Sequence, residues 1–208
     1  MASLIAIYAD ESCLGNGREG ENPGGAGGLM ELAHPRSGAV VRRDYWLSEA
    51  ATTNNRMALR SAIEALRVLS TRGDGYDIVF TSDSLYLVKG MREWVYGWME
   101  RGWRRKGGAL ENVALWQELA EAARAHRIEW RWVRGHDGHP QNEYANWLAT
   151  RAAERQDRSD GAVASEFERW LERERTARRI TLEPDAIPSA RTFRPSPPLP
   201  RPTTGSLF

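Results

Sequence analysis

The first apolar run of the chain ends in a carboxylate. Residues 4–9 are apolar or aromatic, Asp10 follows them, and a polar stretch with Gly and Asn occupies residues 11–17. An apolar run of this length, bounded by turn residues, predicts a buried strand that places Asp10 at the rim of a sheet. Folding does not require an acid there, because an unpaired buried charge is costly. Asp10 is therefore either a functional residue or a cap for the following turn, which is a common role of Asp.

Two more strands are predicted before the first helix. The Gly-rich segment 15–28 begins as a loop and ends in small residues, which suit a strand that other backbones approach closely. Residues 29–32 continue this strand. Residues 40–47 are rich in β-branched and aromatic side chains, which favour a third strand. Three successive strands with short connections predict an antiparallel meander.

The period then changes to that of a helix. Residues 52–55 are Thr and Asn, which cap helices well, and apolar side chains recur at helical spacing over residues 56–69. The next apolar run, residues 76–82, predicts a buried strand that ends at Asp83. A second strand thus places an acid at a sheet rim.

Helices and one strand complete this part of the chain. Helices are predicted over residues 84–90, 112–125 and 141–155. Residues 127–134 alternate between apolar and polar side chains, which predicts a half-exposed strand. Gly, His and Pro in residues 135–140 predict a loop before the last of these helices.

The character of the chain changes after residue 155. We expect a domain over residues 1–155, followed by a densely charged helix over residues 156–180 whose narrow apolar stripe packs on that domain. Seven of the ten prolines lie in residues 181–208. Because this composition cannot bury enough apolar surface to order itself, we predict a disordered tail there.

Composition narrows the class of protein. With a net charge of +1, no global field attracts the chain to nucleic acid, so any basic surface has to be local. Residues 89–106 provide one, with six Lys or Arg, two Glu and three Trp. Cys13 is the one cysteine, which excludes an intramolecular disulfide and a Cys-rich zinc site. No stretch reaches membrane-spanning length and no signal sequence is evident, so we expect a monomeric cytoplasmic protein with no membrane partner.

The two acids at strand ends suggest a metal site. If the strands that end at Asp10 and Asp83 are adjacent and parallel, both carboxylates meet at one edge of the sheet. Like charges in contact repel, and oxygen ligands without a Cys and His cluster favour Mg²⁺ or Mn²⁺ between them. The alternative is two unrelated acids at strand ends.

Over residues 1–155 the chain resembles the ribonuclease HI family in several motifs that occur in the family's order. The motifs are residues 10–16 (DESCLGN), 52–57 (TTNNRM), 81–84 (TSDS), 94–103, 112–116 (NVALW) and 135–143 (GHDGHPQNE). The resemblance implies an α/β, ribonuclease H-like fold with a mixed five-stranded sheet, an antiparallel meander followed by parallel strands, flanked by helices. It also implies Mg²⁺-dependent hydrolysis of the RNA strand of an RNA/DNA hybrid.

The same resemblance implies an incomplete metal site. The family holds two divalent ions with four carboxylates, and the matching positions here are Asp10, Ala58, Asp83 and Asn146. Two carboxylates compensate the charge of two ions poorly, so we expect Mg²⁺ or Mn²⁺ to bind weakly. We expect cleavage to be slower by at least about a thousandfold, or roughly 4 kcal/mol in the barrier.

Two neighbouring acids differ in how well they could compensate. Glu11 follows Asp10 directly and should point to the other face of the sheet if the strand continues. Glu143 is better placed, because it lies three residues before Asn146 on the same helical face.

The resemblance also implies residues that bind the hybrid. In the family, amide and hydroxyl groups contact the minor groove, where the 2′-OH distinguishes RNA from DNA, and grip a phosphate of the DNA strand. The matching residues are Asn16, Asn54 and Asn55 for the groove and Thr53 and Asn112 for the phosphate. The alternative role for residues 52–55 is a helix cap.

Residues 89–106 resemble the family's basic protrusion, whose cations contact phosphates. The expected contacts from this segment are Trp103, Arg104, Arg105 and Lys106. As a charge run alone, the segment would be a solvated face. His136 matches the family's loop histidine, which assists proton transfer or product release.

Two functions are consistent with these observations. The first is a ribonuclease that acts on RNA/DNA hybrids with strongly reduced activity, and the second is a catalytically silent protein that binds or scaffolds such hybrids. The last residues, Ser206-Leu207-Phe208, weakly resemble the end of bacterial sliding-clamp-binding peptides, which suggests a replication protein as a further partner.

Overall fold

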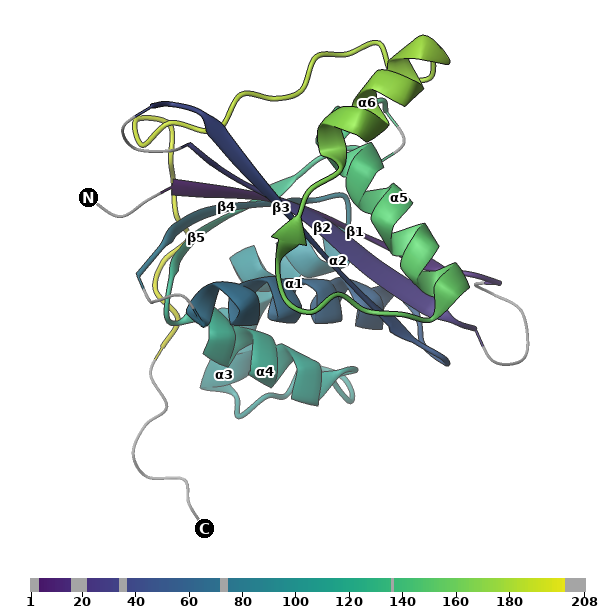
Figure 1. Cartoon of the computed structure of the whole chain (residues 1–208). Coiled ribbons are helices and arrows are strands. Elements are labelled where there is room, and N and C mark those ends of the chain that lie inside the picture. The colour runs from purple at the N-terminus through teal and green to yellow at the C-terminus, as the bar shows by residue number, and fades with distance from the viewer. Residues whose placement is uncertain (1–3, 16–21, 34–36, 72–74, 136, 201–208) are drawn as a thin grey trace.

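A single twisted sheet with helices on both sides organises the computed structural model, which describes residues 4–15, 22–33, 37–71, 75–135 and 137–200 (Figure 1). The strands are β1 (Leu4–Cys13), β2 (Gly24–Ala33), β3 (Val40–Glu49), β4 (Asp77–Ser82), β5 (Arg127–Trp132) and β6 (Val163–Ala164). In the described part of the chain they form one sheet in the order β5-β4-β1-β2-β3-β6. The β1–β2, β2–β3 and β3–β6 pairs are antiparallel, and the β1–β4 and β4–β5 pairs are parallel. The predicted mixed sheet is confirmed, but five strands is wrong by one, because the two-residue β6 adds to the outer edge of β3.

Helices on one side of the sheet share the larger hydrophobic core. They are α1 (Asn54–Ser70), α2 (Leu85–Lys89), the π-helical turn η1 (Gly90–Trp94), α3 (Val95–Glu100) and α4 (Val113–Ala123). Alternate side chains of β1, namely Ile5, Ile7 and Ala9, point into this core, as does much of α1. The helical path that was predicted to end at residue 90 continues to residue 100. Gly90 permits this path, because a Cβ there would lie 2.0 Å from the ring of Trp116.

Helix α5 (Pro140–Arg155) covers the other side of the sheet, over β1 and β2 (Figure 1). Glycines in β2 explain how closely it approaches. A Cβ at Gly25 would lie 2.1 Å from the carbonyl oxygen of Ala149, and one at Gly27 would lie 2.5 Å from the Cβ of Leu148. The small residues of β2 therefore bring α5 against the sheet, with the N-terminal end of the helix beside the end of β1.

The region after α5 differs from the single helix expected over residues 156–180. Helix α6 covers only Phe167–Thr176, and its apolar side chains pack with Tyr144 and Leu148 of α5. Residues before α6 instead bond to β3: the Trp46 indole donates to Asp157 Oδ1 at 2.9 Å, and the Ser159 amide donates to the Trp46 carbonyl at 2.9 Å. These bonds hold residues 157–159 in a non-helical path. A helix over these residues would break the bonds. Within the described ranges, no helix combines the length and the apolar character needed to cross a membrane.

Residues 181–200, called the C-terminal segment below, were expected to be disordered, and the structure corrects this. Figure 1 shows the segment leaving α6 and running down beside β5. Phe193 is buried, and the Ser196 amide donates to the carbonyl oxygen of Ile128 on the edge strand β5 at 2.9 Å. The segment is ordered by the surface of the domain rather than by a core of its own, which composition alone does not reveal. Residues 201–208 lie outside the described residues.

Candidate active site

Parallel pairing of β1 with β4 brings Asp10 and Asp83 together at the rim of the sheet, as the strand pattern predicts. The last paired residues of the two strands are Ala9 and Ser82, so the two acids follow side by side. Asp10 is only 6% exposed. Burial, followed by the charge of Asp83 and more weakly that of Glu143, raises the pKa of the Asp10 carboxyl to about 8. Such a shift indicates a carboxyl that lacks a compensating positive charge.

Glu11 is the third acid of the site. One carboxylate oxygen from each of Asp10, Glu11 and Asp83 lies within 4.8 Å of the others. Burial and the charges of Asp10 and Asp83 raise the pKa of Glu11 well above its usual range, although a hydrogen bond from Ser84 opposes the shift. A cluster of three carboxylates that repel one another is suited to hold a cation.

As predicted, β1 continues past Glu11. The inference that Glu11 is therefore poorly placed to join the site is wrong. Strand β1 continues to Cys13, so Glu11 lies on the same side as Ile7 and Ala9, opposite Asp10. The site lies at the end of the neighbouring strand β4, where side chains from both faces can reach the rim. Two features of the sequence could have indicated Glu11 as a site residue. They are the Asp-Glu pair at a strand end and the alanine at position 58.

Position 58 supplies no ligand to the rim. Ala58 is fully buried in the hydrophobic core, in the same cluster as Ala9. The acid of this site that faces α1 is thus carried by the strand, at Glu11, rather than by the helix.

Helix α5 carries two asparagines near its start, and the one that contacts an acid is not the one that was predicted. Asn142 is buried, and its Nδ2 donates to Asp10 Oδ2 at 3.2 Å. Asn146, which was the predicted residue, lies one helical turn further along and is half-buried. Glu143, between them, contributes charge to the site, and its Oε1 accepts from the Gly138 amide at 3.4 Å. The missed signal was a pair of amides four residues apart at the start of a helix.

The end of β5 fixes the position of Asp83. The Trp132 indole donates to the Asp83 carbonyl oxygen at 2.9 Å. A Cβ at Gly135 would lie 2.1 Å from Asp83 Oδ2. A side chain at position 135 would therefore displace this carboxylate from its place.

Comparison with known proteins identifies the family of the chain. The protein-family profile for RNase H matches residues 2–154. The chain belongs to the ribonuclease H family.

Relatives of this ribonuclease H match most of its length. The ribonuclease H of Pseudomonas entomophila (strain L48) is 40% identical over 155 residues, which are 74% of this chain and 96% of that protein. The ribonuclease H of Janthinobacterium sp. (strain Marseille) is 43% identical over 152 residues, which are 72% and 96%. By family, the chain is therefore a hydrolase, a ribonuclease that acts on RNA/DNA hybrids.

Solved structures agree on the fold. The crystal structure of LC9-RNase H1, a type 1 RNase H with the type 2 active-site motif, is 59% identical with a TM-score of 0.90, and the match covers 99% of this chain and 97% of that one. The match to LC11-RNase H1 in complex with RNA/DNA hybrid has 19% identity and a TM-score of 0.53, and covers 73% and 97%. The second match shows the shared fold alone. The match to LC9-RNase H1 extends beyond the 2–154 region into the C-terminal segment.

The expected hybrid-binding residues of this ribonuclease H occupy helix starts and an exposed loop. Thr53 is the N-cap of α1 and accepts from the Arg56 amide at 3.4 Å, so the expected cap is present, and Asn54 and Asn55 follow it. Asn112 is the N-cap of α4 in a left-handed conformation, with φ of 55°, and its Nδ2 donates to the Tyr86 hydroxyl at 3.2 Å.

The basic loop of the ribonuclease H domain presents its cations to solvent. Trp103 is half-buried and packs against the larger core, while Arg104, Arg105 and Lys106 are exposed. Trp103 thus anchors the loop to the core, and the loop exposes three positive charges to solvent. Asn16 and His136 lie outside the described residues.

Proposed function

We propose that this ribonuclease H hydrolyses the RNA strand of RNA/DNA hybrids with divalent ions, Mg²⁺ or Mn²⁺, held by Asp10, Glu11 and Asp83. The proposal rests on the three carboxylate oxygens that converge within 4.8 Å where β1 and β4 carry them to the rim. Carboxylate oxygens are the donors that both ions prefer. Three negative groups at this separation repel one another, and a bound cation removes that repulsion.

The asparagines of α5 complete the donor set. Asn142 donates to Asp10 and so fixes the orientation of that carboxylate toward the rim. Asn146 offers a neutral carbonyl oxygen at the position where the family carries its fourth carboxylate. Ions bound at such a site activate the attacking water and stabilise the leaving oxygen. We assign His136 to proton transfer or product release.

The third carboxylate changes the rate expected of the chain. The thousandfold deficit assumed two carboxylates, but Glu11 raises the number to three. The remaining replacement, an amide at Asn146, removes one negative charge. We therefore expect a deficit of about tenfold relative to a site with four carboxylates, or about 1.4 kcal/mol in the barrier.

The match to LC9-RNase H1 supports this proposal. That protein combines a type 1 RNase H with the type 2 active-site motif, so a scaffold of this kind accepts a rearranged set of active-site residues. We infer that the Asp10–Glu11 pair, with alanine at position 58, is such a rearrangement here.

The test is cleavage of a 5′-labelled RNA annealed to DNA, in Mg²⁺ and in Mn²⁺, by the wild type and by Glu11→Gln. The variant keeps the size of the side chain and removes its charge. We expect kcat to fall by at least about a hundredfold, or about 2.7 kcal/mol, while hybrid affinity measured in Ca²⁺ changes less than twofold. Glu154→Gln, an exposed glutamate at the far end of α5, is the matched control and should cleave like the wild type. Wild-type turnover by Glu11→Gln would refute the proposal.

A second variant separates the proposal from a silent hybrid-binding protein. Ala58→Glu in the Glu11→Gln background returns a carboxylate to the side of the rim that faces α1, and we expect it to regain at least about tenfold in kcat. A wild type that binds hybrid tightly but cleaves none in either metal, together with a gain of cleavage on Ala58→Glu alone, would instead establish the silent binding protein.

The remaining functional assignments are also proposals. We assign hybrid binding to Asn16, Thr53, Asn54, Asn55, Asn112, Trp103, Arg104, Arg105 and Lys106. We propose that residues 201–208, which end at Phe208, bind a replication protein. A pull-down with and without these residues tests this assignment. We expect a monomer that acts in the cytoplasm.

A further inference from the structure

The C-terminal segment reaches the start of α5, next to the acids. It lies outside residues 2–154, which match the family. Its Asp185 is held by Gln141, whose Nε2 donates to the Asp185 carbonyl oxygen at 2.9 Å and whose Oε1 accepts from the Asp185 amide at 3.1 Å. Two bonds from one buried side chain fix the backbone of residue 185 at this place.

The side chain of Asp185 bonds to the residue that caps α5. The Nε2 atom of His139 lies 3.0 Å from Asp185 Oδ2. The Nδ1 atom of the same ring accepts from the Asn142 amide at 3.3 Å, which is the N-cap bond of the helix. Because Nδ1 accepts, the ring proton is on Nε2, where it is donated to Asp185. The carboxylate of Asp185 thus favours the tautomer that caps the helix.

Asn142 connects this cap to the acids. Its backbone amide is held by His139, and its side chain donates to Asp10 Oδ2 at 3.2 Å. A continuous chain of hydrogen bonds therefore runs from Asp185 through His139 and Asn142 to Asp10. Outer hydrogen-bond partners of this kind orient the groups that hold a metal ion.

We propose that Asp185 is a positioning residue for the metal site, which acts through His139 and Asn142 on the orientation of Asp10. The proposal rests on the function proposed above for the three carboxylates. It assigns a role in the nuclease site to a segment outside the matched family region.

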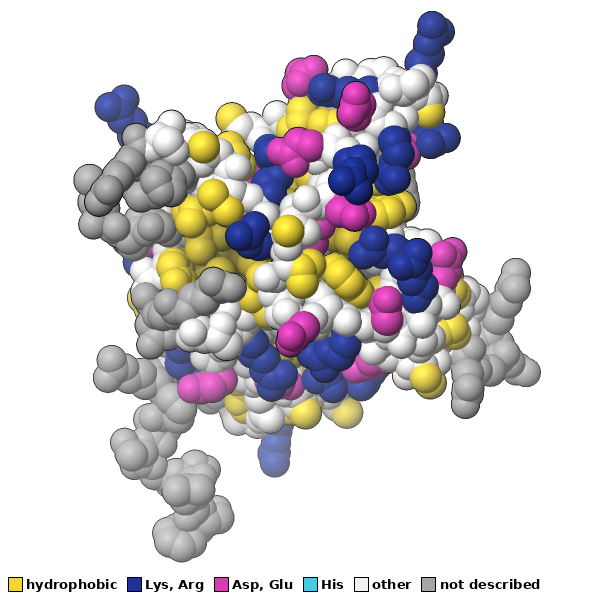
Figure 2. Space-filling view, viewed as in Figure 1, with side chains coloured by type: hydrophobic (Ala, Val, Ile, Leu, Met, Phe, Trp, Pro, Cys, Tyr) yellow, Lys and Arg dark blue, Asp and Glu magenta, His cyan; other side chains and the backbone are white. Residues whose placement is uncertain are grey.

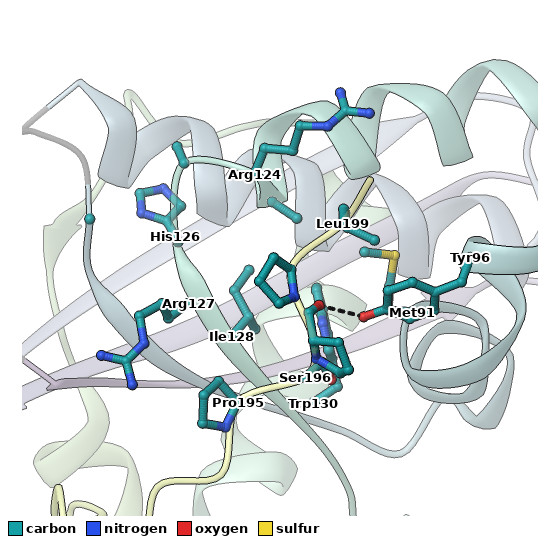
Figure 3. A pocket seen from close by; sticks show the side chains of 15 residues that line it. Met91, Tyr96, Arg124, His126, Arg127, Ile128, Trp130, Pro195, Ser196 and Leu199 are labelled. Atoms are coloured by element: carbon teal, nitrogen blue, oxygen red, sulfur yellow. Dashed lines mark hydrogen bonds between the residues drawn. The ribbon is translucent and has the colours of Figure 1, made fainter. Parts of the chain in front are cut away.

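A second anchor holds the segment independently of Asp185. Residues 195–199 form one wall of a pocket of about 440 Å³ beside β5, with Ile128 and Met91 among the other residues that line it (Figure 3). The Tyr96 hydroxyl donates to the Pro197 carbonyl oxygen at 2.7 Å, as the dashed line in Figure 3 marks. A change in the side chain of Asp185 therefore leaves the segment in place and removes only its bond to His139.

The first test reads the tautomer and does not require activity. Long-range ¹H–¹⁵N correlation spectra of the metal-free full-length protein should show His139 protonated on Nε2 in the wild type and a mixture of tautomers in Asp185→Ala. Asp185→Asn keeps an oxygen that accepts from Nε2 and should retain the wild-type tautomer. An unchanged His139 signal in Asp185→Ala would overturn the proposal.

The second test measures Mn²⁺ affinity by calorimetry and hybrid cleavage in the same variants. Loss of an outer partner typically costs about 10–100-fold in metal affinity or activity, and we expect about tenfold in Mn²⁺ affinity and kcat for Asp185→Ala, with KM unchanged and Asp185→Asn close to the wild type. The control is Glu183→Ala, two residues away, whose carboxylate bonds to Arg175 of α6 at 2.8 Å and not to α5.

The outcomes of the second test are distinct. Equal Mn²⁺ affinity and kcat in the wild type and Asp185→Ala would overturn the positioning role. Equal losses in Asp185→Ala and Glu183→Ala would do so too, because they would indicate general loosening of the segment. Absence of both Mn²⁺ binding and hybrid cleavage in the wild type would refute the proposed function itself. That result concerns the wild type alone, so it is distinct from a failure of the positioning role, which is read from the Asp185 variants.

Discussion

Glu11 and Asp10 illustrate how neighbours on a strand can serve one site. Alternation assigns their side chains to opposite faces, and β1 keeps that alternation through Cys13. At the rim, however, β4 has ended, so its backbone no longer lies between side chains of the two faces. The carboxylates converge there. The sequence predicted Asp10 and Asp83 from strand ends. It could not predict Glu11, because the reach of a side chain around a rim depends on where the neighbouring strand stops.

The raised pKa of Asp10 predicts how the metal-free protein responds to pH. Its carboxyl has a pKa of about 8 in the folded protein against an ordinary value of 3.8. A carboxyl whose pKa is raised by folding holds its proton better in the folded state, so stability falls as pH rises from about 4 to about 8. Asp10→Asn removes this charge. In EDTA at pH 8.5 we expect it to be more stable than the wild type by at least about 1.4 kcal/mol, the equivalent of one pKa unit.

Urea unfolding at pH 5 and pH 8.5 measures this difference. The gain should shrink at pH 5, where Asp10 is protonated, and it should also shrink in millimolar Mg²⁺, which stabilises only the wild type. Asp160→Asn, an exposed aspartate, is the control and should change stability by less than about 0.5 kcal/mol at both pH values. A gain for Asp10→Asn that is equal at both pH values would contradict the assignment.

Helix α5 is placed by the strand beneath it. Its start carries Asn142 and its middle rests on glycines of β2. Periodicity in the sequence predicted this helix and most strands, because each buries an apolar face of its own. It did not predict the order in the C-terminal segment. That order depends on bonds to β5 and α3 that can form only after those elements have folded.

Gly27→Ala tests the close packing of α5 on β2. The new Cβ would lie 2.5 Å from Leu148 Cβ and 2.7 Å from the Ala149 amide nitrogen, so the helix has to move away from the strand. Overpacking of this kind costs about 1–3 kcal/mol. We also expect weaker Mn²⁺ binding, because the shift carries Asn142 away from Asp10.

Gly38→Ala serves as the comparison for Gly27→Ala. Gly38 has φ of 69° and no atom within 4 Å of a Cβ, so it reports backbone strain without crowding. We expect a loss of about 1–2 kcal/mol there and no change in Mn²⁺ affinity. Urea unfolding and calorimetry measure both quantities. Unaltered Mn²⁺ affinity in Gly27→Ala would separate the packing of α5 from the site.

The molecule as a whole carries little net charge, so its contact with nucleic acid has to be local. Lys and Arg side chains are interspersed with Asp and Glu over the face shown in Figure 2. The net charge of +1 agrees with this mixture. The exposed cations of the loop around Arg104 and Arg105 are the basic surface that the family resemblance predicts.

Charge reversal at Arg104 and Arg105 tests this surface. Each phosphate contact contributes about 0.9 to the slope of log affinity against log salt, so Arg104→Glu/Arg105→Glu should lower the slope for hybrid binding by about 2. The matched control is Arg155→Glu/Arg178→Glu, an equal change in net charge at exposed positions far along the chain. Fluorescence anisotropy over a salt series measures the slope. Equal slopes in the two variants would indicate that only net charge matters.

The position of Asp185 in the chain also has a consequence for protein synthesis. The ribosome makes Asp10, Glu11 and Asp83 first and the helix with Asn142 later, whereas Asp185 follows the end of that helix by 30 residues. The domain can therefore collapse around its acids while the partner of His139 is still inside the exit tunnel. The bond that orients the site forms last. On this view the nascent protein binds hybrid before it cleaves efficiently, and full turnover begins only once residue 185 has left the exit tunnel.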